Sequence, residues 1–518
     1  MTQTTLADTS TDIVVIGSGI GGLSCAALLA KYGFNVIVCE SHSIAGGAAH
    51  GFEYDGFKFD SGPSLYSGLS YSPSPNPLQQ VLAAIDEKLP CVTYDTWGCC
   101  LPEGDFDTSV GAEQFCEVLE KLRPQAKAEW QKLQQVMEPY ADAAVALPTA
   151  ALRLDLGAVR TVGKFAPKML RHARNINKLT GPFSQIMNQT VSDPFIRNWL
   201  NLLCFLLSGL PADSTNAAEV AFMFADWYKP NVKLDYPVGG SAALVNALVR
   251  GLKKYNGELM LNAHVEKILV ENRRAVGVKL RNGKTIQARQ AVVSNASVWD
   301  TLKLIPESAI SPKYRRQKQA TPECDSFMHL HLGINAENIR TDLACHYIFV
   351  KDWELGITAP QNVVLVSIPS LLDPSLAPSG KHVIHVYTPG NEPYTLWQGL
   401  DRRSDLYRKQ KQVRAEIMWQ ALERIIPDIK QRCEVTLVGT PLTHERYLRR
   451  HNGSYGPALR AGEGLFPSAR TALRGLFCCG DSTFPGIGLP AVAASGMIAA
   501  NTQVSVNKHL AMLKEIGY

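Results

Sequence analysis

The sequence predicts an α/β fold in which a mainly parallel sheet binds a nucleotide and a second domain is inserted into the chain. Three observations predict it. The run Asp12 to Gly17 is β-branched and typical of a strand buried on both faces, and a Gly-x-Gly-x-x-Gly pattern starts at its end. An Ala/Leu-rich helix pattern and a second strand follow. Short strands then return after Gly257 and again at Leu476.

The first turn has the context that dinucleotide binding requires. Gly17 permits the tight turn, Gly19 lets the backbone approach a pyrophosphate, and Gly22 allows close packing of helix on strand. The helix expected over Leu23 to Lys31 offers free N–H groups to phosphates. Glu40 ends the second strand and is placed to accept hydrogen bonds from a ribose. The alternative, a glycine-rich turn in an ordinary α/β domain, explains fewer of these features.

Two further glycine sites favour FAD over NAD. Gly46 and Gly47 follow the second strand and give a second close approach of the backbone. Gly480 and Asp481 follow the last strand, where the carboxylate can bind ribityl hydroxyls or cap a helix expected over Ser482 to Gly486. No second Gly-x-Gly-x-x-Gly follows a credible strand, so we expect no built-in NAD(P)H domain and an external electron donor or acceptor.

The strands and helices alternate in blocks along the chain. The stretch from Ser72 to Pro230 is mostly helical in pattern, an Asn282–Gly283 turn joins two expected strands, and a strand-rich block runs from Phe327 to Thr388. These blocks predict an FAD-binding domain made of residues 1–75, 231–300 and 441–518, and a mixed α+β substrate domain made of residues 76–230 and 301–440.

Composition excludes several classes of protein. A net charge of +5 over 518 residues is too small to indicate nucleic-acid binding. Twelve cysteines without a Cys-x-x-Cys pair predict neither a disulfide scaffold nor a zinc knuckle. Met1 to Thr11 is polar, which predicts neither a signal peptide nor a transit peptide, and Leu202 to Leu210, the longest apolar run, is too short for a membrane span. We expect a protein that is not secreted and has no transmembrane helix.

One segment is strongly basic. Leu152 to Leu179 carries seven cations against a single acid, Asp155. If it is helical, four of its cations share one face and three apolar side chains lie on roughly the opposite face, an arrangement that suits an anionic membrane surface. The cations are Arg160, Lys164, Lys168 and Arg171, and the apolar residues are Val162, Phe165 and Met169. Pro167 would interrupt such a helix. A solvated basic face on an ordinary helix is the competing interpretation.

Histidines and aromatic residues are the remaining candidates. His329 and His331 share one face of an expected strand, but spacing marks no third ligand, so we predict no metal site. Trp227, Tyr228 and Tyr455, with Trp299, are candidates for lining an apolar pocket.

Six stretches together resemble the carotenoid isomerase (prolycopene isomerase) family, within the flavoprotein group of phytoene desaturases and retinol saturases. The resemblance covers nearly the whole chain. The stretches are Asp12–Ala30 (DIVVIGSGIGGLSCAALLA), Glu40–Leu65 (ESHSIAGGAAHGFEYDGFKFDSGPSL), Asp235–Leu252 (DYPVGGSAALVNALVRGL), Ala291–Thr301 (AVVSNASVWDT), Val438–Pro457 (VGTPLTHERYLRRHNGSYGP) and Gly475–Gly496 (GLFCCGDSTFPGIGLPAVAASG).

The resemblance implies a glutathione-reductase-like, Rossmann-type FAD-binding domain with an inserted substrate domain, and a long polyene as substrate. Carried over by position, the FAD-binding residues are Gly17, Gly19, Gly22, Glu40, Gly46, Gly47, Val265, Gly480 and Asp481. Ala48 stands where amine oxidases of the wider group have arginine, which counts against amine oxidation. The implied location is the cytoplasm or the plastid and thylakoid membrane, with peripheral membrane contact.

A polyene has no ionisable group, so the flavin must act directly on its carbon chain. The resemblance favours redox-neutral cis-trans isomerisation with reduced flavin; desaturation, saturation and hydration are alternatives at the same site. Glu53, Asp60 and His331 are candidate acid or base groups, and each is equally readable as structural. An alternative of another class is a non-enzymatic prenyl or lipid carrier of the GDP-dissociation-inhibitor type, which shares this fold without flavin.

Overall fold

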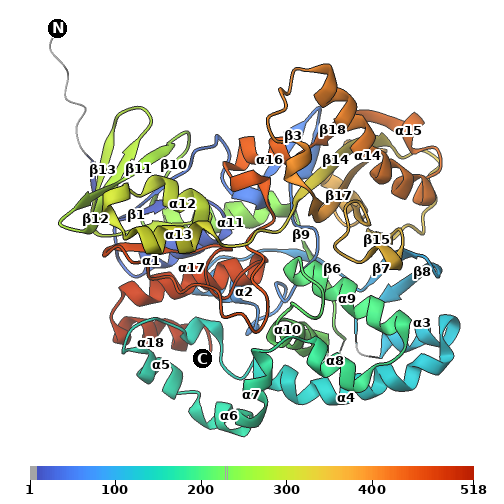
Figure 1. Cartoon of the computed structure of the whole chain (residues 1–518), viewed down its shortest axis with the longest axis horizontal. Helices are drawn as coiled ribbons and strands as arrows, with labels where there is room; N and C mark the ends of the chain where they lie inside the picture. The colour runs from blue at the N-terminus through green and yellow to red at the C-terminus, as the bar shows by residue number, and fades with distance from the viewer. Residues whose placement is uncertain (1–8, 112, 228, 230) are drawn as a thin grey trace.

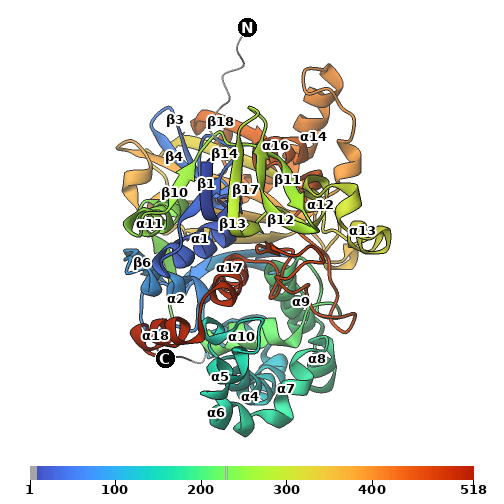
Figure 2. The same cartoon turned by 90° about the vertical axis from the view of Figure 1, so that its left-hand side faces the viewer.

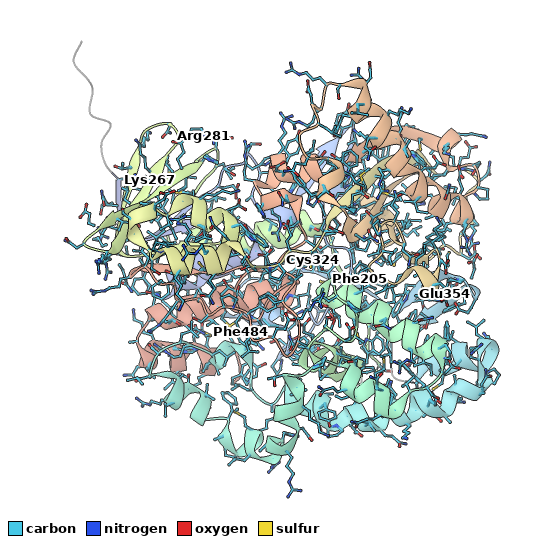
Figure 3. All side chains as sticks on the ribbon, viewed as in Figure 1. Phe205, Lys267, Arg281, Cys324, Glu354 and Phe484 are labelled. Atoms are coloured by element: carbon cyan, nitrogen blue, oxygen red, sulfur yellow. The ribbon has the colours of Figure 1, made fainter. Side chains whose placement is uncertain are left out.

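Two seven-stranded sheets, each covered by helices, form the body of the protein in this computed structural model (Figure 1). The structure describes residues 9–111, 113–227, 229 and 231–518. Lys267 and Arg281 lie at the outer edge of one sheet, whereas Phe205 lies near the centre of the molecule (Figure 3).

The first sheet is built from three separated stretches of the chain. Its strand order is β10 (Glu258–Met260), β2 (Val36–Cys39), β1 (Thr9–Ile16), β13 (Thr285–Ser294), β12 (Arg274–Leu280) and β11 (Val265–Glu271), with β19 (Leu476–Cys478) also paired to β13. Strands β10, β2, β1, β13 and β19 run parallel, while β11 and β12 extend the sheet antiparallel. The predicted turn at Asn282 and Gly283 joins β12 to β13.

Small residues let helices pack closely under this sheet. Helix α1 (Ile20–Lys31) lies against α17 (Leu489–Gln503) and α11 (Gly240–Lys254) (Figure 2). A Cβ atom added to Gly496 would lie 2.2 Å from the carbonyl oxygen of Gly21, so the two backbones meet where a side chain would keep them apart.

The second sheet carries the predicted strand-rich block. Its strand order is β18 (Cys433–Gly439), β14 (Ser326–Asn335), β17 (Lys381–Glu392), β16 (Val363–Ser367), β15 (His346–Val350), β7 (Thr96–Leu101) and β8 (Gly104–Ser109). Helix α14 (Asp405–Ile425) packs on β14 and β16. Strands β7 and β8 come from the stretch that the sequence predicted as mostly helical. They pair along β15, so this hairpin is held by residues about 250 positions away, beyond the reach of local patterns.

Helices fill most of the remaining stretch before residue 230. They are α2 (Pro77–Ala84), α3 (Gln114–Leu122), α4 (Lys127–Ala144), α5 (Ala158–Gly163), α6 (Ala166–Arg171), α7 (Ala173–Leu179), α8 (Ser184–Thr190), α9 (Pro194–Ser208) and α10 (Ala217–Trp227). The other elements are two small sheets, β3 (Gly51–Tyr54) with β4 (Phe57–Asp60) and β5 (Tyr66–Ser67) with β9 (Leu234–Pro237) and β6 (Cys91–Tyr94), and helices α12 (Val298–Leu304), α13 (Pro312–Gln319), α15 (Ile429–Arg432), α16 (Pro441–Leu448) and α18 (Val506–Glu515). None of the described helices is both long and apolar enough to cross a bilayer.

The basic segment forms three short helices, α5 to α7, rather than one. Pro167 stands in the first turn of α6, where proline is compatible with a helix start and ends the preceding helix. Arg153 does not join the basic face: it is buried, pairs with Asp155 and donates to the carbonyl oxygen of Val504.

Candidate functional site

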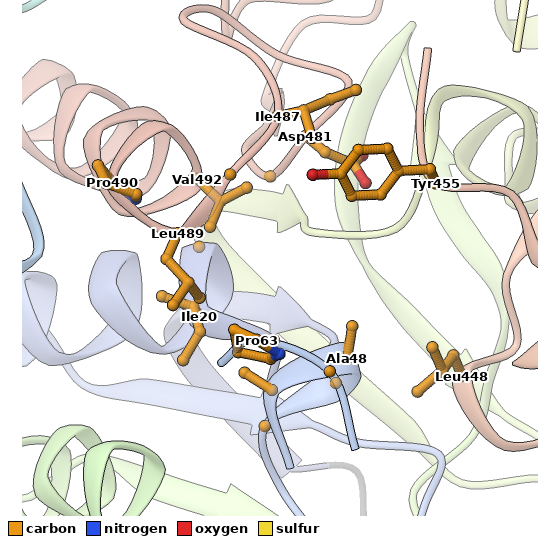
Figure 4. A pocket seen from close by; sticks show the side chains of 18 of the residues that line it. Ile20, Ala48, Pro63, Leu448, Tyr455, Asp481, Ile487, Leu489, Pro490 and Val492 are labelled. Atoms are coloured by element: carbon orange, nitrogen blue, oxygen red, sulfur yellow. The ribbon is translucent and has the colours of Figure 1, made fainter. Parts of the chain in front are cut away.

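A cavity of 1020 Å³ joins the first sheet, the second sheet and the helices α9 and α10. This volume is at the upper end of the range of about 300–1,000 Å³ that is typical of ligand pockets. Its walls include the residues that follow β1, β2, β13 and β19 at their carboxyl ends, where open α/β sheets bind ligands. In Figure 4 the side chains of Ile487, Asp481 and Tyr455 lie across the cavity from Ala48 and Pro63.

The turn after β1 leaves the start of α1 open toward this cavity. Gly17 has a left-handed backbone (φ +89°), and Gly19 occupies the N-cap position without any side-chain cap. The first N–H groups of α1 are therefore free to bind an anion, and the helix dipole favours one. A Cβ added to Gly22 would lie 2.2 Å from the carbonyl oxygen of Gly17, so Gly22 serves helix packing rather than the cavity wall.

Glu40 is fixed in place beside this turn. Its carboxylate accepts hydrogen bonds from the backbone N–H groups of Ser18 (2.8 Å) and His42 (2.7 Å) and from the Ser18 hydroxyl (2.6 Å). The side chain is buried yet lines the cavity. This position suits the predicted contact with ribose hydroxyls.

The second glycine pair folds back onto the first. The N–H of Gly46 donates to the carbonyl oxygen of Ser18 (3.0 Å), and both Gly46 (φ +118°) and Gly47 (φ +57°) are left-handed. A Cβ added to Gly47 would lie 3.0 Å from the Cα of Gly19. The two turns thus form one continuous stretch of backbone, which we call the cradle. A side chain at Gly47 would push the two turns apart.

The C-terminal pair lies next to the first turn of α1, since a Cβ added to Gly21 would lie 3.0 Å from the backbone nitrogen of Gly480. The N–H of Gly480 donates to Ser495, and Asp481 pairs with Arg450 and accepts from Ser482. The helix predicted over Ser482 to Gly486 is wrong: these residues form turns around Pro485, and the next helix is α17. Asp481 therefore caps no helix there, and its carboxylate lines the cavity.

The structure brings eight of the nine predicted cofactor residues into the wall of this single cavity. They are Gly17, Gly19, Glu40, Gly46, Gly47, Val265, Gly480 and Asp481. The cradle of free N–H groups, the fixed carboxylate and the space next to the glycines fit the diphosphate and ribose of FAD.

The three candidate acid or base residues lie outside this wall. Glu53 is exposed on β3. Asp60 is buried, accepts from the Tyr236 hydroxyl and the Ser241 N–H (both 2.7 Å), and has its pKa raised by burial. The Nε2 atom of His331 lies 3.1 Å from the carbonyl oxygen of Asp60. Asp60 and His331 thus hold β4 against α11 and β14, and a role for either side chain as acid or base stays a prediction.

Of the predicted aromatic candidates, Trp227 and Tyr455 line the cavity. Trp299 stacks on His451 instead, with ring centroids 4.9 Å apart, and Tyr228 lies outside the described residues.

Four histidines lie close together at the second sheet, and the sequence pattern indicated only His329 and His331. His329 Nδ1 lies 2.9 Å from His385 Nε2, and His329 Nε2 lies 2.6 Å from His444 Nε2. His385 is opposite His331 on the neighbouring strand, which sequence distance conceals. Burial lowers the pKa of each ring, to about 4 for His331 and about 3 for His444. The rings are therefore neutral at pH 7, so each can donate from one nitrogen and accept at the other.

Nitrogen atoms of His329, His331 and His385 lie within 4.8 Å of one another, close enough to consider a metal ion. Two observations favour hydrogen bonding instead. The His331 and His385 rings are stacked 4.4 Å apart and only 4° from parallel, so their lone pairs do not converge on one point. Tetrahedral zinc also needs ligand nitrogens roughly 3.3 Å apart, given Zn–N bonds of about 2.0–2.1 Å. The absence of a metal site stays a prediction.

Glu219 also lines the cavity, although no motif in the sequence indicated it. Glu219, in the first turn of α10, faces the cavity from the helical side with Phe222 and Met223. Burial raises the pKa of its carboxyl group to about 7. A single glutamate in an Ala/Phe/Met-rich helix is easily taken for a helix-start residue, because acids are common in first turns.

Comparisons with known proteins agree with this geometry. The family model described as flavin containing amine oxidoreductase matches residues 20–502. Prolycopene isomerase 1 of an Oncidium hybrid cultivar is 33% identical over 95% of this chain and 83% of its own length. The lycopene-forming phytoene desaturase of Pseudescherichia vulneris is 26% identical over 95% of this chain and 98% of its own. A solved oxidoreductase from Methanosarcina mazei shares the fold, with a TM-score of 0.61, 20% identity, and 94% and 99% of the two chains covered.

Proposed function

The chain belongs to the flavin-containing amine oxidoreductase family, in the group of the prolycopene isomerases, and we propose that it is an FAD-dependent enzyme that isomerises double bonds of a carotenoid-type polyene. The observation that carries this proposal is the continuity of the cavity, which runs from the glycine cradle to a wall of apolar side chains. That wall includes Leu203, Leu206, Phe222, Met223, Ile348 and Leu365.

FAD binding follows from the residues of the cradle. The N–H groups at the start of α1 would hold the diphosphate, Glu40 the ribose next to the adenine, and Val265 the adenine edge through its backbone. Asp481, already paired with Arg450, would meet the ribityl hydroxyls. When bound, the reduced flavin supplies negative charge beside the double bond that rotates. The chain itself binds the hydrocarbon, excludes water from it and holds it in one orientation.

Two alternative reactions, desaturation and saturation, are those of relatives named as a desaturase and as retinol reductases. These relatives are 24–26% identical to this chain, whereas the prolycopene isomerase is 33% identical, which favours isomerisation. Amine oxidation is disfavoured by Ala48, which lines the cavity without charge. The carrier alternative has no support among these relatives, which are all named as enzymes.

The test is incubation of the purified flavoprotein with cis and all-trans carotenoids, without oxygen, with the flavin first oxidised and then reduced. We expect a change of geometry at constant mass with reduced flavin only, read by chromatography and mass spectrometry. Conversion with oxidised flavin and loss of two hydrogens would instead identify a desaturase. A colourless protein that FAD cannot reconstitute would contradict the enzyme itself.

We also propose that the surface of α5 to α7 contacts a membrane that contains the substrate. We call this the basic surface; it combines exposed cations with exposed apolar side chains. Leu156 is 92% exposed, Val159 77% and Leu170 73%, which is unusual for large apolar residues. The exposed cations are Arg160, Lys164, Lys168, Arg171, Arg174 and Lys178.

Sedimentation with vesicles tests the basic surface. Replacing Lys164, Lys168 and Arg171 by glutamate should abolish binding to anionic vesicles, because each cation near such a surface contributes about 1 kcal/mol. Lys279, Lys313 and Arg316 replaced by glutamate carry the same charge change elsewhere on the exposed surface and should bind nearly as wild type does. Equal loss in both variants would show that net charge alone matters.

A further inference from the structure

Glu219 stands apart from the other acidic side chains of the cavity wall. Six acidic residues line the cavity, and four of them form ion pairs: Asp226 with Lys229, Glu266 with Arg281, Asp300 with Lys303, and Asp481 with Arg450. Glu40 is held by two backbone N–H groups. Within the described part of the chain, Glu219 has no cationic partner, and its hydrogen bond is a long one, 3.5 Å from the side-chain amide of Asn216.

The surroundings of Glu219 offer no compensation for its charge. Among the described residues, its titratable neighbours are Cys204 of α9 and Tyr455, which follows α16, and burial raises the pKa of both. Both side chains are therefore neutral. An uncompensated carboxylate in such a place is costly. The group therefore takes up and releases its proton near neutral pH, where an acid–base catalyst works best.

A helix-capping role does not account for this residue. A glutamate three residues after the N-cap commonly accepts from the N–H of the cap residue. Here its contact is with the Asn216 side chain, whose own Oδ1 atom is buried without a hydrogen-bond partner. The carboxyl group instead faces the same cavity as Phe222, Met223 and Tyr455.

We propose that Glu219 is the catalytic acid–base group, which gives a proton to a carbon of the polyene and removes a proton from that carbon after rotation. This inference rests on the proposed function and names the side chain that carries its proton step. The carboxylic acid O–H bond breaks and a C–H bond forms, leaving a carboxylate and a conjugated carbocation. The former double bond then rotates as a single bond. The carboxylate then removes one of the two hydrogens that this carbon now carries as a proton, so that the double bond re-forms and no electrons are gained or lost.

The position of Glu219 suits such a step. The neutral phenol of Tyr455 lies near enough for the charge of Glu219 to act on it, and Tyr455 lies beside Asp481 at the cofactor side of the cavity (Figure 4). Glu219 thus stands on the apolar wall of the cavity and within electrostatic reach of the side where the cradle would hold the flavin.

The experiment compares Glu219→Gln and Glu219→Asp with wild-type holoenzyme, using Glu117→Gln, an exposed glutamate of α3, as the matched control. We expect Glu219→Gln to keep full flavin occupancy and KM and to lose kcat by a factor of about 100 or more. Glu219→Asp should recover part of kcat, and Glu117→Gln should match wild type. In D2O, wild type should introduce deuterium into the recovered polyene, and Glu219→Gln should not. A Glu219→Gln enzyme within about twofold of wild-type kcat would overturn the proposal.

A second measurement does not depend on turnover. Infrared difference titration of the wild-type flavoprotein should show a protonated carboxyl band that disappears near pH 7 and is missing in Glu219→Gln. A wild-type protein without this band would contradict the proposal even if the enzyme is active. Failure of wild type to convert any carotenoid would instead refute the proposed function, so the two failures are distinguishable.

Discussion

The nucleotide cradle and the apolar wall of the same cavity are built in different ways. The cradle is made of backbone: Gly17, Gly19, Gly46 and Gly47 lie in two short loops that touch each other. The wall is made of side chains from α9, α10, β15 and β16, and its members Leu203 and Leu365 lie about 160 positions apart in the chain. A backbone site requires particular residue types at fixed local spacing, whereas a side-chain wall tolerates many sequences of similar volume.

This difference explains what the sequence could and could not predict. The turn after β1, the acid at Glu40 and the second glycine pair were all predicted, since each is local. Glu219 and the partners of His329 were missed, because strand pairing and helix packing bring them together. The same reason accounts for β7 and β8. It also accounts for the contacts of Asp60 and His331, which join residues far apart in the chain.

The largest expected effect is in the cradle. Gly19→Val should give a folded protein almost free of flavin, because a Cβ there would lie 2.7 Å from Asn295 and its methyl groups would fill the place of the diphosphate. The ratio of flavin absorbance to protein absorbance after purification measures the flavin content. Gly163→Val is the control, since a Cβ at that position meets nothing within 4 Å. Full flavin occupancy in Gly19→Val would contradict the proposed placement of the cofactor.

Acid should have the next largest effect, because it protonates the buried histidines of β14. The pKa of His331 is lowered from 6.5 to about 4, chiefly by burial. Below pH 6.5 the unfolded chain binds a proton that the folded protein does not, so stability is complete above pH 6.5 and falls toward pH 4. One such histidine changes the free energy of unfolding by up to about 3 kcal/mol over this pH range. Denaturant midpoints should therefore fall between pH 7 and pH 5, less steeply for His331→Gln than for wild type. His172→Gln, on the turn between α6 and α7, should keep the wild-type slope.

Glu219 should show the opposite dependence on pH. Its pKa is raised from 4.5 to about 7, so between these values the folded protein holds a proton that the unfolded chain has lost. Stability therefore falls as pH rises through this window, by up to about 3 kcal/mol. Glu219→Gln avoids this loss and should melt at a higher temperature than wild type at pH 8, with little difference at pH 4. An equal or lower melting temperature at pH 8 would mean that the carboxylate has a compensating partner.

The smallest expected effect is that of a metal chelator, which should change neither melting temperature nor activity. The nitrogens of His329 already share protons with His385 and His444 at 2.9 and 2.6 Å, distances that suit hydrogen bonds between neutral rings. Binding zinc would need the stacked rings of His331 and His385 to turn and break these bonds. Elemental analysis of the purified protein should find metal well below one ion per chain, and His385→Asn should not alter that content. One metal ion per chain in wild type that is lost in His385→Asn would contradict this prediction. It would show that the histidines, like the cradle, are arranged around a bound group.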